Sequence, residues 1–400
     1  MNILFLTLHP ISDISERGIY TDLMREFIRH GHQIHIVVPA ERRFHLSTGI
    51  KESEGAKILS VKTLNIQKTN LIEKGLGTLL LEYQYQRAIR KYWKNIKFDL
   101  ILYSTPPITF NRVISSVKRR CEAKTYLLLK DIFPQNAVDL GMFSKGSFVY
   151  KLFRKKEERL YQLSCHIGCM SPANVEYVLR HNPLITAERV EVCPNSIELH
   201  GKKSGYNNGG LLQKLNIPTD KLLLIYGGNL GRPQGVDFLM NVLAANEKRT
   251  DTYFVVVGNG TEYEKISQWF RNNTPHNSCL IPSLPKQEYD DLVSTCDVGL
   301  IFLDNRFTIP NYPSRLLSYL ENRMPVLMAT DMNTDIGPIA EKNGYGLWTE
   351  SGNLETFMEM VEFVAGDREK LKLMGEKGYD YLKDNYTVER TYRIIMKHFQ

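Results

Sequence analysis

Residues 222–235 (LLLIYGGNLGRPQG) constrain the fold of this chain more than any other segment. Their apolar run is typical of a buried parallel strand, and it stops at Gly227 and Gly228. The next segment, VDFLMNVLAANEK, repeats apolar residues at helical spacing. A glycine-rich turn between a strand and a helix lets a ligand approach the backbone, and the helix offers unpaired N–H groups to an anion. We therefore expect a phosphate or diphosphate here; the alternative is a plain strand-to-helix turn.

A second segment, residues 309–329 (IPNYPSRLLSYLENRMPVLMA), is expected to supply the other half of this site. Ser314 is placed as the N-cap of a helix whose leucines form an apolar stripe, and Pro325 introduces a strand. Arg232 in the first segment and Arg315 in the second would then bring two positive charges to one pocket. Two helix N-termini and two arginines predict a site for a doubly charged anion.

The turn GNLG-R-x-QG, the helix PSR-LL-x-Y and the strand R-x-P-V together resemble the retaining GT-B glycosyltransferases of family four. The similarity is closest to the bacterial subgroup that builds surface polysaccharides such as capsule and O-antigen. It implies an α/β protein of two doubly wound Rossmann-like domains that face each other across a cleft. It also implies a nucleotide-sugar donor, most simply a UDP-sugar, and neither a metal nor a cofactor. The donor-binding residues implied are Gly18, Gly228, Asn229, Arg232, Gln234, Gly258, Asn259, Gly260, Ser314, Arg315 and Ser318.

The chain length agrees with two domains. The 400 residues exceed the usual size of one domain, and 42% hydrophobic residues suffice for two cores. We expect an acceptor-side domain over residues 1–200 and a nucleotide-sugar-binding domain over residues 201–380. Residues 381–400 look like the C-terminal helix that returns to the first domain in GT-B proteins. Residues 200–210 (HGKKSGYNNGG) lack periodicity, as a solvent-exposed connection would.

Several other classes of protein fit poorly. No apolar run approaches the about 18 residues of a membrane span, and the amino terminus does not read as a signal peptide, so we expect a cytoplasmic protein. Six cysteines without a CxxC pair favour a reducing compartment and argue against a zinc site. The GxGxxG pattern of nicotinamide enzymes is absent.

Basic residues are concentrated in the first half of the chain. Up to Asn195 there are 29 Lys and Arg against 18 Asp and Glu, whereas the remainder has 22 against 26. Two helices are expected to carry much of this charge, one over residues 71–97 and one that contains Lys151 to Arg159. In the first, we expect the core-facing side chains to be Leu76, Leu79, Leu80, Tyr83, Ala88, Tyr92 and Ile96.

The basic residues of the two helices form two clusters. They are Arg87, Arg90, Lys91, Lys94 and Lys97, and Lys151, Arg154, Lys155, Lys156 and Arg159. Each such residue near an anionic leaflet contributes about 1 kcal/mol, so an anionic membrane surface is a candidate partner at the inner face of the cell membrane. The alternative is a solvated helix face.

Asp131 is the leading candidate for a catalytic carboxylate. It follows the apolar run TYLLLK, and ligands of open α/β sheets gather at the carboxyl ends of strands. The segment also resembles the D-[LI]-[WF]-P signature of the polysaccharide subgroup, which implies contact with the sugar or with the acceptor hydroxyl. The alternative is an aspartate that caps the following turn. With Arg232 and Arg315, Asp131 completes the predicted catalytic set.

The sequence departs from the wider family at four positions. Two glutamates that many members place eight residues apart correspond to Pro310 and Ser318, and the basic residues of the first turn correspond to Asn229 and Gln234. These departures keep a non-catalytic sugar-binding protein open as an alternative. A UDP-sugar 2-epimerase on the same fold is a second alternative, although no matching acid–base and histidine cluster is found. Nucleic-acid binding is the weakest interpretation, because basic and aromatic residues do not interleave.

The predicted function is transfer of a sugar, with retention, from a nucleoside diphosphate donor to a saccharide or polyprenyl-diphosphate-linked acceptor. Arg232 and Arg315 would stabilise the charge that develops on the leaving diphosphate. As in related enzymes, the leaving phosphate oxygen would deprotonate the acceptor on the same face of the sugar.

Overall fold

The computed structural model describes residues 1–66, 71–200 and 209–399, and it divides into two compact units. The first unit comprises Met1–Glu198 with Val388–Gln400, and the second comprises Leu199–Thr387. The sequence places these boundaries at residues 200 and 380. Most of the expected connection over residues 200–210 lies outside the described residues. Within those residues, no helix has the length and apolar character needed to cross a bilayer.

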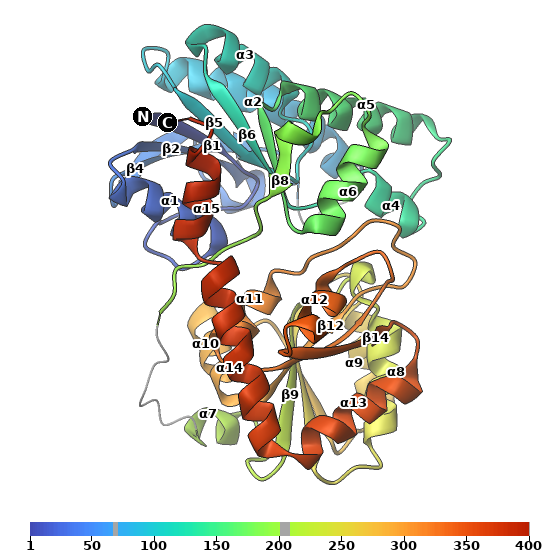
Figure 1. The fold of residues 1–400 in the computed structure, drawn as a ribbon. Helices are drawn as coiled ribbons and strands as arrows, with labels where there is room; N and C mark the ends of the chain where they lie inside the picture. Colours follow the sequence, from blue (N-terminus) through green and yellow to red (C-terminus); the bar gives the residue numbers. More distant parts are fainter. Residues whose placement is uncertain (67–70, 201–208, 400) are drawn as a thin grey trace. The chain divides into compact units, whose positions relative to one another are not determined.

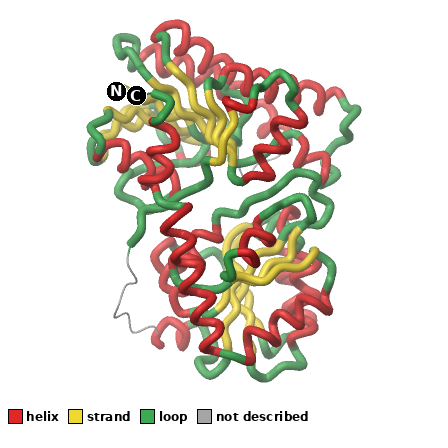
Figure 2. The backbone as a smooth tube through the Cα atoms, viewed as in Figure 1, coloured by secondary structure: helices red, strands yellow, loops and turns green. Residues whose placement is uncertain are grey.

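The first unit is built on an eight-stranded sheet of order β3-β4-β2-β1-β5-β6-β7-β8 (Figures 1 and 2). All neighbouring strands pair in parallel except β3 and β4, which are antiparallel. The strands are β1 (Asn2–Leu6), β2 (Gln33–Glu41), β3 (Gly49–Ser53), β4 (Ala56–Thr63), β5 (Leu100–Ser104), β6 (Lys124–Leu129), β7 (His166–Cys169) and β8 (Val190–Val192).

The helices of the first unit connect these strands and lie on the sheet's faces (Figure 1). They are α1 (Ile19–Arg29), η1 (Arg42–Phe44), α2 (Leu71–Tyr92), α3 (Asn111–Cys121), α4 (Gln135–Asp139), α5 (Phe148–Leu163), α6 (Pro172–His181), η2 (Ala187–Arg189) and α15 (Val388–Met396). Ser147 caps α5, because its hydroxyl accepts a hydrogen bond from Tyr150 N, and Ser171 caps α6 in the same way. The C-terminal α15 lies beside α1, so the two ends of the chain share this unit.

The second unit contains a fully parallel six-stranded sheet of order β11-β10-β9-β12-β13-β14. Its strands are β9 (Leu222–Asn229), β10 (Thr252–Asn259), β11 (Ser278–Ile281), β12 (Val298–Phe302), β13 (Val326–Thr330) and β14 (Gly346–Glu350). Its helices are α7 (Gly209–Lys214), η3 (Arg232–Gln234), α8 (Val236–Asn246), α9 (Tyr263–Asn273), α10 (Lys286–Thr295), α11 (Arg315–Glu321), α12 (Ile336–Lys342), α13 (Leu354–Gly366) and α14 (Arg368–Asn385). The order reverses between β9 and β12, where ligands of doubly wound sheets bind.

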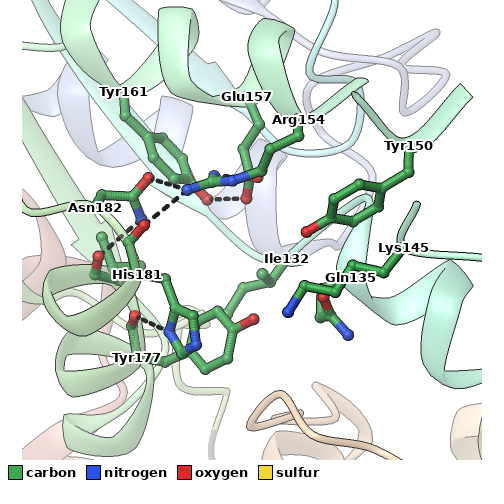
Figure 3. Close-up of a pocket in the computed structure, with 11 residues that line it drawn as sticks. Ile132, Gln135, Lys145, Tyr150, Arg154, Glu157, Tyr161, Tyr177, His181 and Asn182 are labelled. Atoms are coloured by element: carbon green, nitrogen blue, oxygen red, sulfur yellow. Dashed lines mark hydrogen bonds and ion pairs between the residues drawn. The ribbon is translucent and has the colours of Figure 1, made fainter. Parts of the chain in front are cut away.

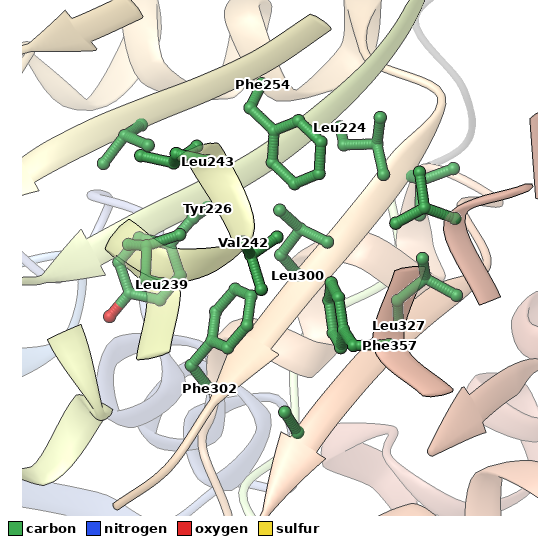
Figure 4. Packing of buried hydrophobic residues seen from close by; sticks show 14 of the residues in the cluster. Leu224, Tyr226, Leu239, Val242, Leu243, Phe254, Leu300, Phe302, Leu327 and Phe357 are labelled. Carbon is green, nitrogen blue, oxygen red and sulfur yellow. The ribbon is translucent and has the colours of Figure 1, made fainter. Parts of the chain in front are cut away.

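The core of the second unit lies between the sheet and the helices α8 and α13 (Figure 4). Phe302 of β12 lies between two helical aromatics, with ring centroids 6.0 Å from Phe238 and 5.1 Å from Phe357. All three rings are buried, and burial of such a side chain stabilises the fold by about 1.5–3 kcal/mol. This packing holds the carboxyl end of β12 and the start of α8 in place beside β9.

Helix α2 contradicts the sequence-based expectation for its core face. Leu76, Leu79, Leu80 and Tyr83 are between 44% and 53% exposed. The buried hydrophobic side chains are Leu81, Tyr85, Ile89 and Trp93, together with the expected Ala88. Both sets repeat at helical spacing, so the pattern alone does not say which one meets β4. The helix also ends at Tyr92 rather than Lys97.

Two further elements differ from expectation. The segment 41–70 contains the strand β3 in addition to the expected strand near Ala56, and the pair forms an antiparallel hairpin. The carboxyl-terminal segment 381–400 is not one helix, because α14 ends at Asn385 and α15 starts at Val388. The backbone N–H of Val388 donates to the carbonyl of Ile197 at 3.2 Å, which ties this break to the end of the first unit's other segment.

Candidate functional site

The glycine-rich segment lies at the carboxyl end of β9, beside the point where the strand order of the second sheet reverses. Contrary to the expected turn, Gly227 and Gly228 are still part of the strand, which pairs with β10 as far as Asn229. The short helix η3 contains Arg232 and Gln234, and Gly235, with a φ of 55°, leads into α8. The turn therefore spans Leu230 to Gly235.

The glycines are required because the carboxyl ends of β9 and β10 pack closely against each other. A Cβ on Gly258 would lie 1.8 Å from the carbonyl oxygen of Gly228, and one on Gly260 would lie 2.3 Å from that of Leu230. Gly228 and Gly258 also have φ values of 117° and 153°, which L side chains rarely adopt. Gly258, Asn259 and Gly260 thus form the neighbouring wall of the same strand-end surface.

Arg315, the first residue of α11, points its guanidinium at this surface. Its Nη2 donates a hydrogen bond of 2.7 Å to Gln234 Oε1, and its Cζ lies 4.4 Å from the centre of the Tyr226 ring. The Cζ is also 3.8 Å from the position of a Cβ on Gly228. Its Nη1 is buried and has no hydrogen-bond partner within the described ranges. A buried, charged donor without a partner is costly, so this geometry favours an anionic ligand beside Gly228.

Arg232, Ser314 and Ser318 were also predicted to contact the donor, and their environments differ from that of Arg315. Arg232 is 61% exposed, and its Nε lies 3.4 Å from Glu262 Oε1. Ser314 occupies the N-cap position of α11, but its side chain accepts no capping hydrogen bond, contrary to expectation. Because α11 has only seven residues, Arg315 itself, and not a long helix dipole, is the main positive group of this second segment. Ser318 lies one turn further along α11 and is partly buried.

Three tyrosines that sequence reasoning missed support the strand end. The Tyr319 hydroxyl lies 3.2 Å from both the backbone nitrogen of Gly227 and the carbonyl of Ile225. The Tyr226 hydroxyl donates to the carbonyl of Asn229 at 2.6 Å. Tyr289, on α10, covers Gly227 so closely that a Cβ there would meet its hydroxyl at 2.1 Å. The sequence could have predicted that Tyr319 lies near this site, because it follows Arg315 by four residues and therefore lies on the same helix face.

Asp131 and Gly18 belong to the first unit. Asp131 follows β6 at its carboxyl end, and Asn136 Nδ2 donates to both carboxylate oxygens at 2.9 and 3.0 Å. Burial raises the pKa of Asp131 to about 6 even though these hydrogen bonds favour the ionised form. Asp131 does not occupy the N-cap of α4, which is Pro134. Gly18 begins α1, and its N–H donates to Asp22 Oδ1 at 2.9 Å.

Asn136 is a second group at this site that the sequence did not indicate. Its Oδ1 is buried and accepts no hydrogen bond from the residues that the structure describes. Asp131 and Asn136 therefore present hydrogen-bond acceptors side by side, as recognition of hydroxyl groups requires. In the same described part of the chain, no three His, Cys, Asp or Glu side chains lie close enough together to hold a metal ion.

Comparison with known proteins relates both units to glycosyltransferases. Residues 211–381, which make up most of the second unit, match the family model described as glycosyl transferases group 1. The probable glycosyltransferase WbjE of Pseudomonas aeruginosa is 22% identical over 283 residues, which is 70% of this chain and 68% of WbjE. The putative colanic acid biosynthesis glycosyl transferase WcaI of Escherichia coli is 22% identical over 394 residues, or 93% of each chain.

Solved structures with the same fold cover the whole chain. Sucrose-phosphate synthase from Thermosynechococcus elongatus superimposes with a TM-score of 0.75 at 13% identity, over 100% of this chain and 98% of that one. Anabaena Alr3699/HepE in complex with UDP-glucose superimposes with a TM-score of 0.71 at 14% identity, over 100% and 99%. The fold is therefore GT-B, with two Rossmann-like α/β units, and the match to the group 1 model falls within the second unit.

Proposed function

We propose that this protein is a retaining, metal-independent glycosyltransferase of bacterial surface polysaccharide biosynthesis. The donor is a nucleoside diphosphate sugar, most simply a UDP-sugar, and the acceptor is a saccharide or a polyprenyl-diphosphate-linked saccharide. The group 1 domain and the similarity to WcaI support transferase chemistry in polysaccharide assembly. The donor class is supported by the Alr3699/HepE complexes with UDP and with UDP-glucose.

One feature carries the proposal: the Arg315 guanidinium, whose Nη1 has no hydrogen-bond partner among the described residues and whose Cζ and Nη2 lie 3.8 Å from the position of a Cβ on Gly228. A diphosphate beside Gly228 would lie next to the Arg315 guanidinium and would accept charge-assisted hydrogen bonds from it. Charge-assisted hydrogen bonds of this kind are about twice as strong as neutral ones. Because Gln234 and the Tyr226 ring already hold the guanidinium, little reorganisation is needed when the ligand binds.

The reaction follows from this placement. The bond between the anomeric carbon and the diphosphate oxygen breaks, and negative charge develops on the diphosphate next to Arg315 and Arg232. The acceptor oxygen forms the new bond on the face that the diphosphate leaves, and its proton passes to the leaving phosphate oxygen. Fixed donors that stabilise such a leaving group typically each contribute about a hundredfold to a thousandfold in rate.

Asp131 serves the acceptor side of this reaction. With Asn136 it offers the acceptor atoms that orient a sugar or acceptor hydroxyl. A carboxylate held at this position is an orienting group, because the leaving phosphate takes the proton. Ser318 and Pro310, in place of the two glutamates of the wider family, would leave the donor sugar to be recognised by other contacts.

The test is release of nucleoside diphosphate from a panel of nucleotide-sugars, with and without a saccharide acceptor. We expect UDP release that depends on the acceptor and a product with the anomeric configuration of the donor. Conversion of the nucleotide-sugar without any acceptor would identify an epimerase instead. No release with any donor, together with no thermal stabilisation by UDP, GDP or ADP, would reject the proposal; a ligand at 100 times its Kd stabilises by about 2.7 kcal/mol.

Peripheral contact with an anionic membrane is the second part of the proposal, and the exposed face of α2 favours it. Leu76, Leu79, Leu80 and Tyr83 of α2 are exposed, and so are Phe148, Val149 and Leu152 of α5. An ion pair of 3.2 Å between Lys156 Nζ and Glu82 Oε1 links the two helices. Exposed apolar side chains flanked by Arg87, Lys151 and Lys155 are the combination that interfacial helices use.

A further inference from the structure

The first unit contains a cavity that none of the predicted site residues lines. It has a volume of about 180 Å³ and lies between the α4–α5 connection and the helices α5 and α6 (Figure 3). A water molecule takes up about 30 Å³ of liquid, and pockets for drug-sized ligands have about 300–1,000 Å³. The cavity therefore suits a single small ring.

The back wall of the cavity is fixed by a closed network of hydrogen bonds. Arg154 donates to Glu157 Oε2 at 2.5 Å and to Asn182 Oδ1 at 2.8 Å, and the Tyr161 hydroxyl donates to Glu157 Oε1 at 2.8 Å. These side chains satisfy one another, as the dashed lines in Figure 3 show. Because their hydrogen bonds are used within this wall, a ligand would be recognised by the other groups that line the cavity.

Four polar groups lie around the opening of the cavity. They are the hydroxyls of Tyr150 and Tyr177, Nε2 of His181 and Nζ of Lys145. The His181 ring is stacked on the Tyr177 ring at a centroid distance of 4.0 Å, and its Nδ1 is held by the carbonyl of Tyr177. Tyr150 and Lys145 point into the cavity from the opposite side (Figure 3).

This combination has the chemistry of a saccharide site. Aromatic rings present flat apolar faces with polar tips, which suit a sugar ring that has C–H groups on its faces and hydroxyls at its rim. The ammonium of Lys145 has no carboxylate partner in the described part of the chain, so it adds a preference for negative charge. A bare phosphate would leave the ring faces unused.

We propose that this cavity binds one acidic sugar ring, a uronic acid residue, with the ring against Tyr150 and Tyr177 and the carboxylate at Lys145. Ile132 lines the cavity and adjoins Asp131 in the chain. The cavity is accordingly a subsite for a second sugar of the acceptor. That role rests on the proposed transferase function, whereas binding of the uronic acid does not.

Isothermal titration of the full chain with methyl glucuronide and methyl glucoside tests this proposal. We expect the uronide to bind at least about tenfold more tightly than the glucoside, which is the effect of one charged hydrogen bond. Lys145→Gln removes this preference, and Tyr150→Ala weakens both ligands. Lys155→Gln, which changes a cation of α5 that does not line the cavity, binds as the wild type does.

Other outcomes overturn the proposal. These are no uronide binding at millimolar concentrations, uronide binding that Lys145→Gln and Tyr150→Ala leave unchanged, or binding of inorganic phosphate or a nucleoside at this cavity in its place. Thermal stabilisation by UDP, measured on the same proteins, reports on the diphosphate site. A failure of the saccharide site is thereby separated from a failure of the proposed function.

Discussion

Arg315 Nη2 donates a hydrogen bond of 2.7 Å to Gln234 Oε1, which joins the two segments that carry the candidate donor site. The amide accepts this bond without adding charge. A lysine at position 234, which the family resemblance would suggest, would place a second cation against the Arg315 guanidinium. The neutral Gln234 is thus compatible with Arg315 as the principal cation at Gly228, and its hydrogen bond holds Nη2 near the strand end.

Substitution of the two arginines should separate their roles. Arg232→Ala should cost less than about 0.5 kcal/mol of stability, because the side chain is largely exposed. Arg315→Ala should cost about 1 kcal/mol, because a contact between a cation and an aromatic ring is lost. We expect Arg315→Ala to slow transfer about a hundredfold or more and Arg232→Ala to slow it less. Affinity for UDP, measured by calorimetry, should fall in the same order.

The double variant measures the coupling of the two arginines. If both stabilise the leaving diphosphate, Arg232→Ala with Arg315→Ala should be worse than either single change. UDP affinity and turnover like those of the wild type in the double variant would refute the diphosphate site.

Asp131→Asn should preserve the fold and the affinity for nucleoside diphosphate while lowering the rate of transfer. Asn136 still finds an oxygen acceptor in the variant, but the negative charge that orients the acceptor hydroxyl is lost. Steady-state kinetics with a varied acceptor, together with UDP binding, provide the measurement. An unfolded variant would show instead that Asp131 is a structural residue.

The raised pKa of Asp131 predicts how stability depends on pH. Burial raises it from 3.8 to about 6, so the folded state takes up a proton at a higher pH than the unfolded state does. The stability linked to this proton is fully present below about pH 4 and is lost as the pH rises through about 6, by at most about 3 kcal/mol. Urea unfolding of wild type and Asp131→Asn at pH 4 and 7 should show the variant gaining relative stability at pH 7. A constant difference between the two proteins would contradict this prediction.

The packing of Gly258 against Gly228 predicts a severe effect of a single methyl group. Gly258→Ala places a Cβ 1.8 Å from a carbonyl oxygen at a φ of 153°, so we expect a loss of about 3 kcal/mol or more and no UDP binding. Gly366→Ala is the control, because its Cβ would meet no atom within 4 Å and its φ is not positive. Denaturant unfolding of the two variants should differ accordingly, and equal stabilities would show that the strand ends can separate.

If α2 and α5 contact the membrane, both their apolar and their basic side chains should contribute to binding of anionic vesicles. Wild type should co-sediment with anionic vesicles at low salt and less so at high salt. Leu79→Ser with Phe148→Ser should weaken binding about tenfold or more, because burial of each such side chain contributes about 1.5–3 kcal/mol. Leu184→Ser, which changes an exposed leucine outside both helices, should have no effect. An equal loss of vesicle binding in all variants, or vesicle binding that does not depend on lipid charge, would argue against this surface.

The sequence by itself determined the elements whose signals are local. The apolar run of β9, the helical spacing of α8 and the position of Asp131 directly after β6 depend on neighbouring residues, and the structure confirms each of these elements. Alternating strands and helices also predicted parallel doubly wound sheets, whereas the GT-B fold was implied by the family resemblance. A resemblance in two short segments supplied the expected donor class.

Only the tertiary structure decided which residues meet. The burial of one face of α2 depends on a choice between two apolar helix faces. The hydrogen bonds between Asn136 and Asp131 and the packing of three tyrosines behind β9 depend on how the chain folds in space. The contrast between Arg232, which is exposed, and Arg315, whose buried Nη1 has no hydrogen-bond partner in the described part of the chain, has the same origin. Periodicity reports how a segment folds locally, whereas burial, charge and hydrogen-bond partners arise when separate segments pack together and exclude water.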